Sequence, residues 1–320
     1  MSPRPLSLFG LGASRAYAEL VAAELEVPLA PHEERDFEDG EHKARPLQDV
    51  RGHDVFVIHA LHGEPTQSPN DKLARLLFFC GALKDAGAGH VTAVTPYLCY
   101  ARKDRRTKPN DPITTRYVAA MIEAVGIGRL ITVEVHNVAA FENAFRCPTW
   151  HIESAPLFAA HFAGLLGAGP AVAVSPDTGG AKRAEQFRAA LEALTRREVG
   201  GAYVEKFRSG GVVSGGRMVG EVRGRTAVIV DDLISTGTTL LRAAKACREA
   251  GAARVFAAAA HGLFIGGAPE LIDTSALERI VILDTVPPAR LTPDARARRL
   301  SVVGSAASVA RVITDFHDRT

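Results

Sequence analysis

The sequence has few cysteines and almost no net charge. Its 320 residues include only four cysteines, Cys80, Cys99, Cys147 and Cys247, and no two of them form a C-x-x-C pair. Disulfide frameworks and cysteine-based metal clusters are therefore not expected, and a reducing cytoplasm fits. The formal net charge is only +2, so no strong field would attract nucleic acid or an anionic membrane.

Long apolar runs are also missing. The N-terminal stretch MSPRPLSLFGLGASRAY has no long apolar segment followed by a cleavage site, and we identify no membrane span. We therefore expect a cytoplasmic protein without a signal peptide. A composition of 47% hydrophobic and 23% charged residues is ordinary for a soluble globular chain, and the length suits two domains of typical size.

One local pattern recurs along the chain. In residues 82–97, 121–136 and 246–261, an amphipathic helical stretch ends at a glycine, and a β-branched or small apolar run follows. Glycine readily adopts the backbone that ends a helix, so this order predicts repeated helix–strand units. Such units indicate α/β domains with mainly parallel sheets. Strands are expected near 54–59, 91–95, 130–135, 171–175, 226–231, 254–259 and 279–283.

Two of these units resemble each other over a longer stretch. Residues 70–88 and 238–252 agree in helix phase and ending, and each follows a strand, HDVFVIH or RTAVIVD. The pattern leaves open whether this is a true duplication or the ordinary likeness of helix–strand units. A duplication would make the chain two copies of one domain, with the boundary near residues 150–156.

The segment VIVDDLISTGTTL, residues 228–240, carries the strongest functional signal. A buried strand is expected over Val228–Val230. Asp231 and Asp232 follow it, at the edge where open α/β sheets bind ligands. The turn Ser235–Thr239 then opens a helix, so its backbone N–H groups and hydroxyls favour a phosphate. Carboxylates pair with sugar hydroxyls or face hydrated Mg²⁺, which predicts a sugar-phosphate site; the alternative is an acidic strand end with an ordinary helix cap.

This segment resembles the phosphoribosyl pyrophosphate loop of type I phosphoribosyltransferases and ribose-phosphate pyrophosphokinases. Other segments resemble the second family in the same order: FEDGE (37–41), VRGHDVFVI (50–58), PYLCYARKDRR (96–106), PITTRYVA (112–119), VEVHN (133–137) and VSPDTGGAKRA (174–184). The resemblance implies an α/β fold of two tandem type I phosphoribosyltransferase-like domains, residues 1–153 and 154–320. It leaves open whether the last helix packs back on the N-terminal domain.

The resemblance also implies a reaction. ATP would give its β,γ-pyrophosphoryl group to the 1-hydroxyl of ribose 5-phosphate in a Mg²⁺-dependent step, which yields phosphoribosyl pyrophosphate and AMP. Such transfer needs mainly positioning and charge neutralisation. Two other functions compete: a phosphoribosyltransferase, and a non-catalytic homologue that regulates an active enzyme. The family further implies a homo-oligomer, because a neighbouring subunit supplies the loop that holds adenine.

Residue roles follow from the same resemblance. The adenine loop corresponds to Phe37, Asp39, Gly40 and Glu41. The remaining ATP contacts are Arg102 and Lys103. Metal ligands are expected at His136 and at Asp177, for which a ribose-side acid is the alternative. The resemblance implies that Lys206 and Arg208 are catalytic. The ribose 5-phosphate site comprises Arg208, Asp231, Asp232, Ser235, Thr236, Gly237, Thr238 and Thr239.

Several positions depart from the family pattern. Lys103 stands where glutamine is usual, Ser235 replaces a frequent aspartate, and Thr238 replaces a usual glycine. The loop 105–114 is shorter and has proline and aspartate in place of basic residues, which predicts weak regulation by phosphate and ADP. The Gly- and Ser-rich stretch 208–218 predicts a loop that closes over the substrates.

Overall fold

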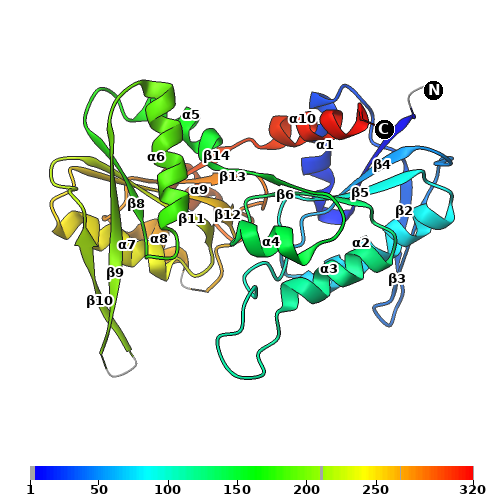
Figure 1. The fold of residues 1–320 in the computed structure, drawn as a ribbon, viewed down its shortest axis with the longest axis horizontal. Coiled ribbons are helices and arrows are strands. Elements are labelled where there is room, and N and C mark those ends of the chain that lie inside the picture. Colours follow the sequence, from blue (N-terminus) through cyan, green and yellow to red (C-terminus); the bar gives the residue numbers. More distant parts are fainter. Residues whose placement is uncertain (1–3, 210–211, 267, 320) are drawn as a thin grey trace. The chain divides into compact units, whose positions relative to one another are not determined.

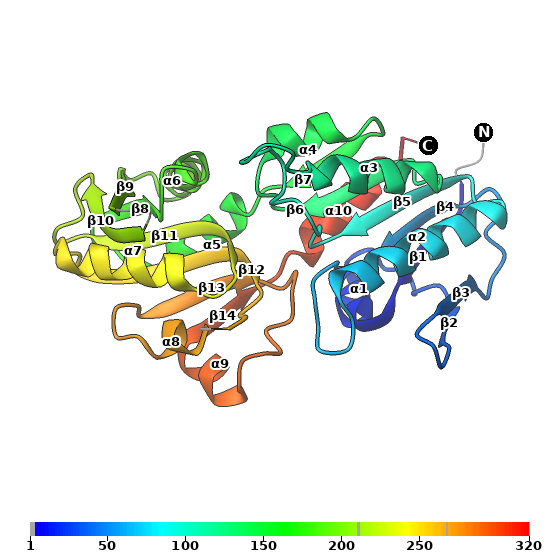
Figure 2. The same ribbon diagram turned by 90° about the horizontal axis from the view of Figure 1, so that it is seen from below.

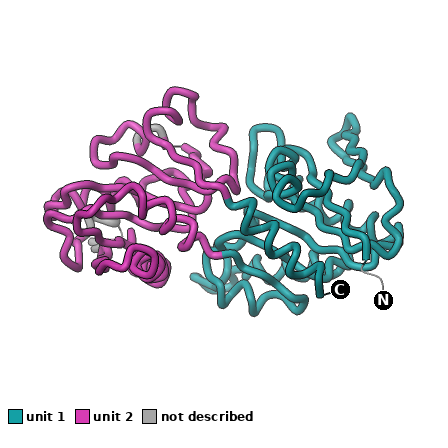
Figure 3. The backbone as a smooth tube through the Cα atoms, turned by 90° about the horizontal axis from the view of Figure 1, so that it is seen from above, with its two compact units in different colours: residues 1–152, 305–320 teal, residues 153–304 magenta. Residues whose placement is uncertain are grey.

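The computed structural model describes three stretches of the chain, residues 4–209, 212–266 and 268–319. Within them, some side chains lie outside the described part, those of residues 206–209, 212–216 and 269–270. The chain divides into two compact units, Met1–Ile152 with Ser305–Thr320, and Glu153–Gly304 (Figure 3). Among the described residues, no helix is both long and apolar enough to cross a membrane.

The first unit is built on a five-stranded sheet in the order β1-β4-β5-β6-β7, with all neighbours parallel (Figure 1). Its strands are β1 (Leu6–Gly10), β4 (Asp54–Ile58), β5 (His90–Thr95), β6 (Arg129–Val133) and β7 (Thr149–Ile152). Its α-helices are α1 (Arg15–Glu24), α2 (Pro69–Asp85), α3 (Thr114–Ala124), α4 (Val138–Ala144) and α10 (Ala306–His317), and a short 3-10 turn spans Gly12–Ser14. All five residues of β4 are buried, as expected for a parallel strand with both faces covered.

A separate antiparallel hairpin belongs to this unit. Its strands β2 (His32–Asp36) and β3 (His42–Pro46) pair with each other as a two-stranded sheet. The sequence analysis did not predict them, because HEERD and HKARP lack the apolar alternation that marks a half-buried strand.

The second unit has a seven-stranded sheet in the order β10-β9-β8-β11-β12-β13-β14 (Figure 2). Its strands are β8 (Ala171–Ser175), β9 (Val199–Ser209), β10 (Val212–Val219), β11 (Thr226–Ile234), β12 (Arg254–Gly262), β13 (Arg279–Leu283) and β14 (Leu300–Val303). Its helices are α5 (Ala155–Leu165), α6 (Ala181–Thr195), α7 (Thr238–Glu249), α8 (Ala268–Asp273) and α9 (Pro293–Arg299). Among the described residues of this sheet, β9 and β10 pair antiparallel and the other neighbouring strands pair parallel.

The predicted helix stops are confirmed. Gly87, Gly126 and Gly251 follow α2, α3 and α7 with φ of +86°, +87° and +89°, the left-handed conformation that glycine adopts without strain. The start of α2 is fixed by a capping box. The Ser68 hydroxyl accepts a hydrogen bond from the Asp71 amide, and the Asp71 carboxylate accepts one from the Ser68 amide.

Both units follow one connection order, which favours a duplication. In the first, β1 leads through α1 and the β2–β3 hairpin to β4, α2 and β5. In the second, β8 leads through α6 and the β9–β10 hairpin to β11, α7 and β12. The sheet orders β1-β4-β5-β6-β7 and β8-β11-β12-β13-β14 correspond strand by strand. The residue that follows β4, His59, therefore corresponds to Asp231 in β11.

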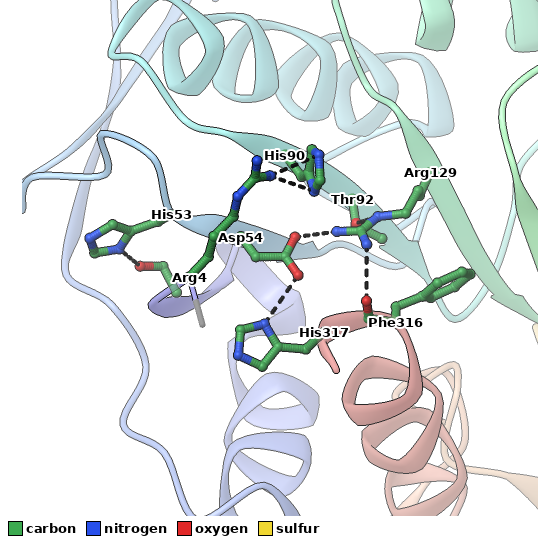
Figure 4. A network of polar contacts seen from close by, with 9 residues as sticks. Arg4, His53, Asp54, His90, Thr92, Arg129, Phe316 and His317 are labelled. Carbon is green, nitrogen blue, oxygen red and sulfur yellow. Dashed lines mark hydrogen bonds and ion pairs between the residues drawn. The ribbon is translucent and has the colours of Figure 1, made fainter. Parts of the chain in front are cut away.

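The last helix belongs to the first unit. The Tyr17 hydroxyl in α1 and the Ser305 hydroxyl before α10 lie 2.7 Å apart. At the other end of α10, the fully buried Asp54 carboxylate accepts a hydrogen bond from Arg129 and contacts Nδ1 of His317 at 3.2 Å (Figure 4). Arg129 also donates to the Phe316 carbonyl at 3.3 Å (Figure 4). The segment from Ser305 to His317, which contains α10, is therefore bonded to the N-terminal unit.

The expected closing loop over residues 208–218 needs correction. Most of this stretch is strand, because β9 and β10 form a long antiparallel hairpin that projects beyond the rest of its sheet (Figure 1). The pairing slips between Val213 and Gly216, which indicates a bulge. The stretch itself contains the β-branched residues Val212 and Val213, a residue type that favours strand over loop.

Candidate active site

The two aspartates lie inside a strand, not after it. β11 continues through Asp231 and Asp232 to Ile234 because β12 pairs with it along this whole length, with Asp231 opposite Ala259. On the other side, pairing with β8 ends at Ile229. The acids therefore lie beyond the end of the β8 ladder, at the carboxyl edge of the sheet where open α/β folds bind ligands.

Burial and mutual repulsion dominate the electrostatics of this pair. Asp232 is 5% exposed, and its amide donates to Oδ1 of Asp231 at 2.9 Å. Burial, reinforced by the neighbouring Asp232 carboxylate, raises the pKa of Asp231 to about 8. Arg183 in the first turn of α6 opposes this shift, since Nη1 lies 3.9 Å from Oδ1 of each aspartate. An acidic pair with one partly buried and one buried member, beside an arginine, favours a bound cation or sugar hydroxyls.

The turn after β11 has the geometry expected of a phosphate loop. Gly237 caps α7 with φ of +80°, and an added Cβ there would lie 2.9 Å from the Leu271 side chain, so only glycine fits. Thr236 and Thr238 are exposed, with their hydroxyls 3.0 Å apart. Backbone amides at the start of the 12-residue α7 are available in the same place.

Asp177 lies in the turn after the adjacent strand β8. Its Oδ1 accepts hydrogen bonds from the amides of Gly179 and Gly180 at 3.0 and 3.1 Å. An added Cβ at Gly180 would lie 2.8 Å from the Ser175 hydroxyl, so this turn is closely packed. The second unit thus brings Asp177, the β11 aspartates and the Ser235–Thr239 turn to one edge of its sheet.

The predicted catalytic residues Lys206 and Arg208 lie in β9. This strand pairs with β8 up to Tyr203, opposite Ser175, and then continues past the end of β8 to Ser209. Both side chains lie outside the described part of the chain.

The predicted adenine loop forms the tip of the β2–β3 hairpin. The Phe37 amide donates to the Glu41 carbonyl at 2.8 Å, and Gly40 turns the chain with φ of +89°. Asp39, Gly40 and Glu41 are exposed, and the guanidinium of Arg35 lies 5.0 Å from the centre of the Phe37 ring. The tip is thus an exposed loop with one aromatic ring that a planar base could stack against.

Three further predicted residues follow the adjacent strands β5 and β6. Arg102 and His136 are exposed, whereas Nζ of Lys103 lies 2.7 Å from Oδ2 of Asp111. A hydrogen bond of 2.7 Å from Asn137 to Asp104 joins the two loops. The first unit therefore gathers Arg102, Lys103 and His136 at the carboxyl edge of its sheet.

No group of three or more His, Cys, Asp or Glu side chains among the described residues is arranged to hold a metal ion. The chemistry of the second unit nevertheless fits Mg²⁺. Asp177, Asp231 and Asp232 supply the carboxylate oxygens that Mg²⁺ prefers. Burial, and then the neighbouring Asp232 charge, raise the pKa of Asp231, and a bound cation would oppose both effects. His136, in the first unit, offers a nitrogen, which Mg²⁺ prefers less.

The sequence analysis missed two residues of these clusters. Arg183 gives no local signal, because its partners lie in a strand far along the chain. The sequence shows Asp111 as an acid in a loop where basic residues are usual. It does not show that Asp111 pairs with Lys103, which is predicted to contact ATP.

Comparison with known proteins decides the family. Residues 6–126 match the model of the N-terminal domain of ribose phosphate pyrophosphokinase, and residues 215–319 match the phosphoribosyl synthetase-associated domain. The chain is 35% identical over 324 residues to ribose-phosphate pyrophosphokinase 1 of Streptococcus pyogenes, covering 100% of this chain and 97% of that protein. The chain belongs to the ribose-phosphate pyrophosphokinase family. The resemblance seen in its motifs is thereby confirmed.

Other relatives of this family agree. Ribose-phosphate pyrophosphokinase 1 of Streptococcus pneumoniae is 37% identical over 293 residues, which cover 89% of this chain and 87% of that protein. The crystal structure of phosphoribosylpyrophosphate synthetase from Mycobacterium smegmatis superposes with a TM-score of 0.89 at 31% identity, covering 99% of this chain and 100% of that one. The predicted fold class is confirmed.

Proposed function

We propose that the chain is a ribose-phosphate diphosphokinase, which transfers the β,γ-pyrophosphoryl group of ATP to the 1-hydroxyl of ribose 5-phosphate. The products are phosphoribosyl pyrophosphate and AMP. The observation that carries the proposal is the β11 strand end, where an acidic pair, Asp231 and Asp232, precedes a glycine-capped helix start. The whole length of the chain also matches this family. A cytoplasmic location is part of the proposal.

Ribose 5-phosphate binds at the β11 strand end. Its phosphate lies on the Ser235–Thr239 turn, where amides at the start of α7 and the hydroxyls of Thr236 and Thr238 donate to it. Its ring hydroxyls donate to Asp231 and Asp232, which accept them best when ionised. Ser235 keeps a hydroxyl in the turn, so phosphate binding tolerates the loss of the usual aspartate.

ATP binds through elements of the first unit. Arg102 and Lys103 meet the triphosphate, while Phe37 stacks on adenine and Asp39, Gly40 and Glu41 contact its edge. The exposed hairpin tip supports delivery of this loop to a neighbouring copy of the chain, so we infer a homo-oligomer. A monomer would then bind ATP weakly.

Charge neutralisation is the main catalytic task, because negative charge grows on the β-phosphate oxygens and on the departing AMP. Lys206 supplies a compact positive charge for those oxygens, and Arg208 can donate two hydrogen bonds to them at once. In the second unit, Asp177 and the β11 aspartates would hold Mg²⁺, which would supply Lewis acidity when bound. His136 in the first unit stays a separate predicted metal ligand.

Phosphorus NMR of the purified protein with ATP, ribose 5-phosphate and Mg²⁺ tests the reaction. Matched appearance of AMP and phosphoribosyl pyrophosphate is the expected result. Appearance of ADP instead would indicate an ordinary sugar-phosphate kinase. Bound ribose 5-phosphate without turnover would favour the regulatory homologue.

A further inference from the structure

One carboxylate oxygen in the first unit collects four hydrogen-bond donors. Oδ2 of Asp111 accepts from Nζ of Lys103 at 2.7 Å and from the Thr107 hydroxyl at 2.7 Å. It also accepts from the backbone amides of Thr107 and Lys108, each at 3.0 Å. Nε of Arg106 donates to the Asp111 carbonyl at 3.2 Å, so the loop closes on Asp111 from several sides.

These donors are the kind that bind oxyanions in loops. Two successive backbone amides, a hydroxyl and an ammonium group together form a concave anion site. Here the chain's own carboxylate fills it. The Lys103 ammonium, together with the Thr107 and Lys108 donors, holds the pKa of Asp111 well below its ordinary range, so this anion is permanently present.

The same loop carries the proposed ATP contacts. Lys103 is one of the four donors, and Arg102 precedes it. The Thr115 hydroxyl closes the base of the loop, because it donates to the carbonyls of Tyr100 and Lys103 at 2.9 and 3.2 Å. The loop that contains Arg102 is therefore held at its base by Thr115 and at its far end by Asp111.

We propose that Asp111 is a built-in oxyanion that positions Lys103 and Arg102 for the triphosphate of ATP. Asp111 is a positioning residue, because it acts through its four donors. The proposal rests on the function proposed above and deepens it: the loop is ordered for ATP without any added anion.

Chemical rescue tests this role. In Asp111→Gly the donors lose their anion, and we expect the KM for ATP to rise about tenfold, as loss of charge-assisted hydrogen bonds would produce. The KM for ribose 5-phosphate should stay within about twofold, because its site lies in the second unit. Sodium formate or phosphate should restore much of the loss, whereas sodium chloride at equal ionic strength should not.

Two further variants test whether the negative charge of Asp111 itself is required. Asp111→Asn fills the space with a neutral amide, so its KM for ATP should rise and formate should not restore it. Asp85→Asn removes an exposed carboxylate at the end of α2 and should leave the KM for ATP unchanged. A lower KM for ATP in Asp111→Gly would overturn the proposal, because Asp111 would then merely mask the Lys103 charge. A raised KM that no oxyanion restores, in a variant with a normal melting temperature, would overturn it too.

A second readout needs no turnover. Trypsin should cut Asp111→Gly after Arg105 or Arg106 faster than it cuts the wild type, and formate should slow that cutting; equal cutting would overturn the proposal. Wild-type protein that makes no phosphoribosyl pyrophosphate would overturn the proposed function, while proteolysis and calorimetry of ATP binding would still decide the role of Asp111.

Discussion

Nη1 of Arg183 lies 3.9 Å from Oδ1 of Asp231 and equally far from Oδ1 of Asp232. Arg183 thus places a positive charge near the partly buried Asp231 and the buried Asp232 at the proposed sugar site. Because the pKa of Asp231 is already raised to about 8 by burial and by Asp232, loss of the guanidinium should raise it further.

Arg183→Gln should therefore weaken ribose 5-phosphate binding. We expect kcat/KM for ribose 5-phosphate to fall about tenfold near neutral pH. The sign of the pH effect follows from the shift: a higher pKa leaves less ionised Asp231, so the deficit should shrink between about pH 7 and pH 9. Arg183→Lys should restore part of the loss, and exposed Lys182→Gln is the control. A deficit independent of pH would mean that Arg183 does not act through Asp231.

Lys206→Ala should separate catalysis from binding. Lys206 is proposed to stabilise charge that grows only during transfer, so kcat should fall at least about a hundredfold. Calorimetry should show ribose 5-phosphate bound as in the wild type. Lys245→Ala, an exposed lysine on α7, serves as the control. Unchanged turnover would remove Lys206 from the mechanism.

His59 should make the fold acid-sensitive. Its ring is fully buried, and burial, with help from the nearby Lys72 charge, lowers its pKa to about 3. The unfolded chain takes up a proton at this residue below its ordinary pKa, but the native state does not. Stability should therefore fall as pH drops from about 6.5 towards 3, by up to about 1.4 kcal/mol per pH unit from this group.

Urea unfolding of His59→Gln across this range measures the effect. The free energy of unfolding of the variant should depend less on pH than that of the wild type, even if the variant is less stable at neutral pH. Parallel curves would show that another group causes the acid sensitivity.

Much of the fold could be predicted because the relevant signals are local. The strand DVFVI and the helix-ending glycine at position 87 can each be recognised from a few neighbouring residues. The β2–β3 hairpin could not be predicted, since polar strands that form their own small sheet have no apolar pattern. The length of β11 was underestimated because its partner β12, not its own sequence, extends it to Ile234.

The candidate site also has one part that could be predicted from the sequence and another that could not. The aspartates and the phosphate turn lie within thirteen residues, 228–240, so their chemistry could be inferred from one segment. The role of Arg183 depends on the packing of α6 against β11, and the capture of Lys103 by Asp111 depends on how one loop folds. Neither contact can be inferred from the spacing of the residues in the sequence.

Gly237→Ala offers the most direct test of the phosphate turn, because the chain provides a matched control. Both Gly237 and Gly224 have positive φ, +80° and +70°, so alanine at either position carries the same kind of backbone strain. Only at Gly237 would the new Cβ collide with Leu271, at 2.9 Å, whereas nothing lies within 4 Å at Gly224. Gly224→Ala should thus cost about 1 kcal/mol of stability and leave the KM for ribose 5-phosphate unchanged. Gly237→Ala should raise that KM about tenfold or more, because α7 must shift away from the phosphate. Equal effects of the two substitutions on KM would show that strain alone matters and that the start of α7 does not hold the phosphate.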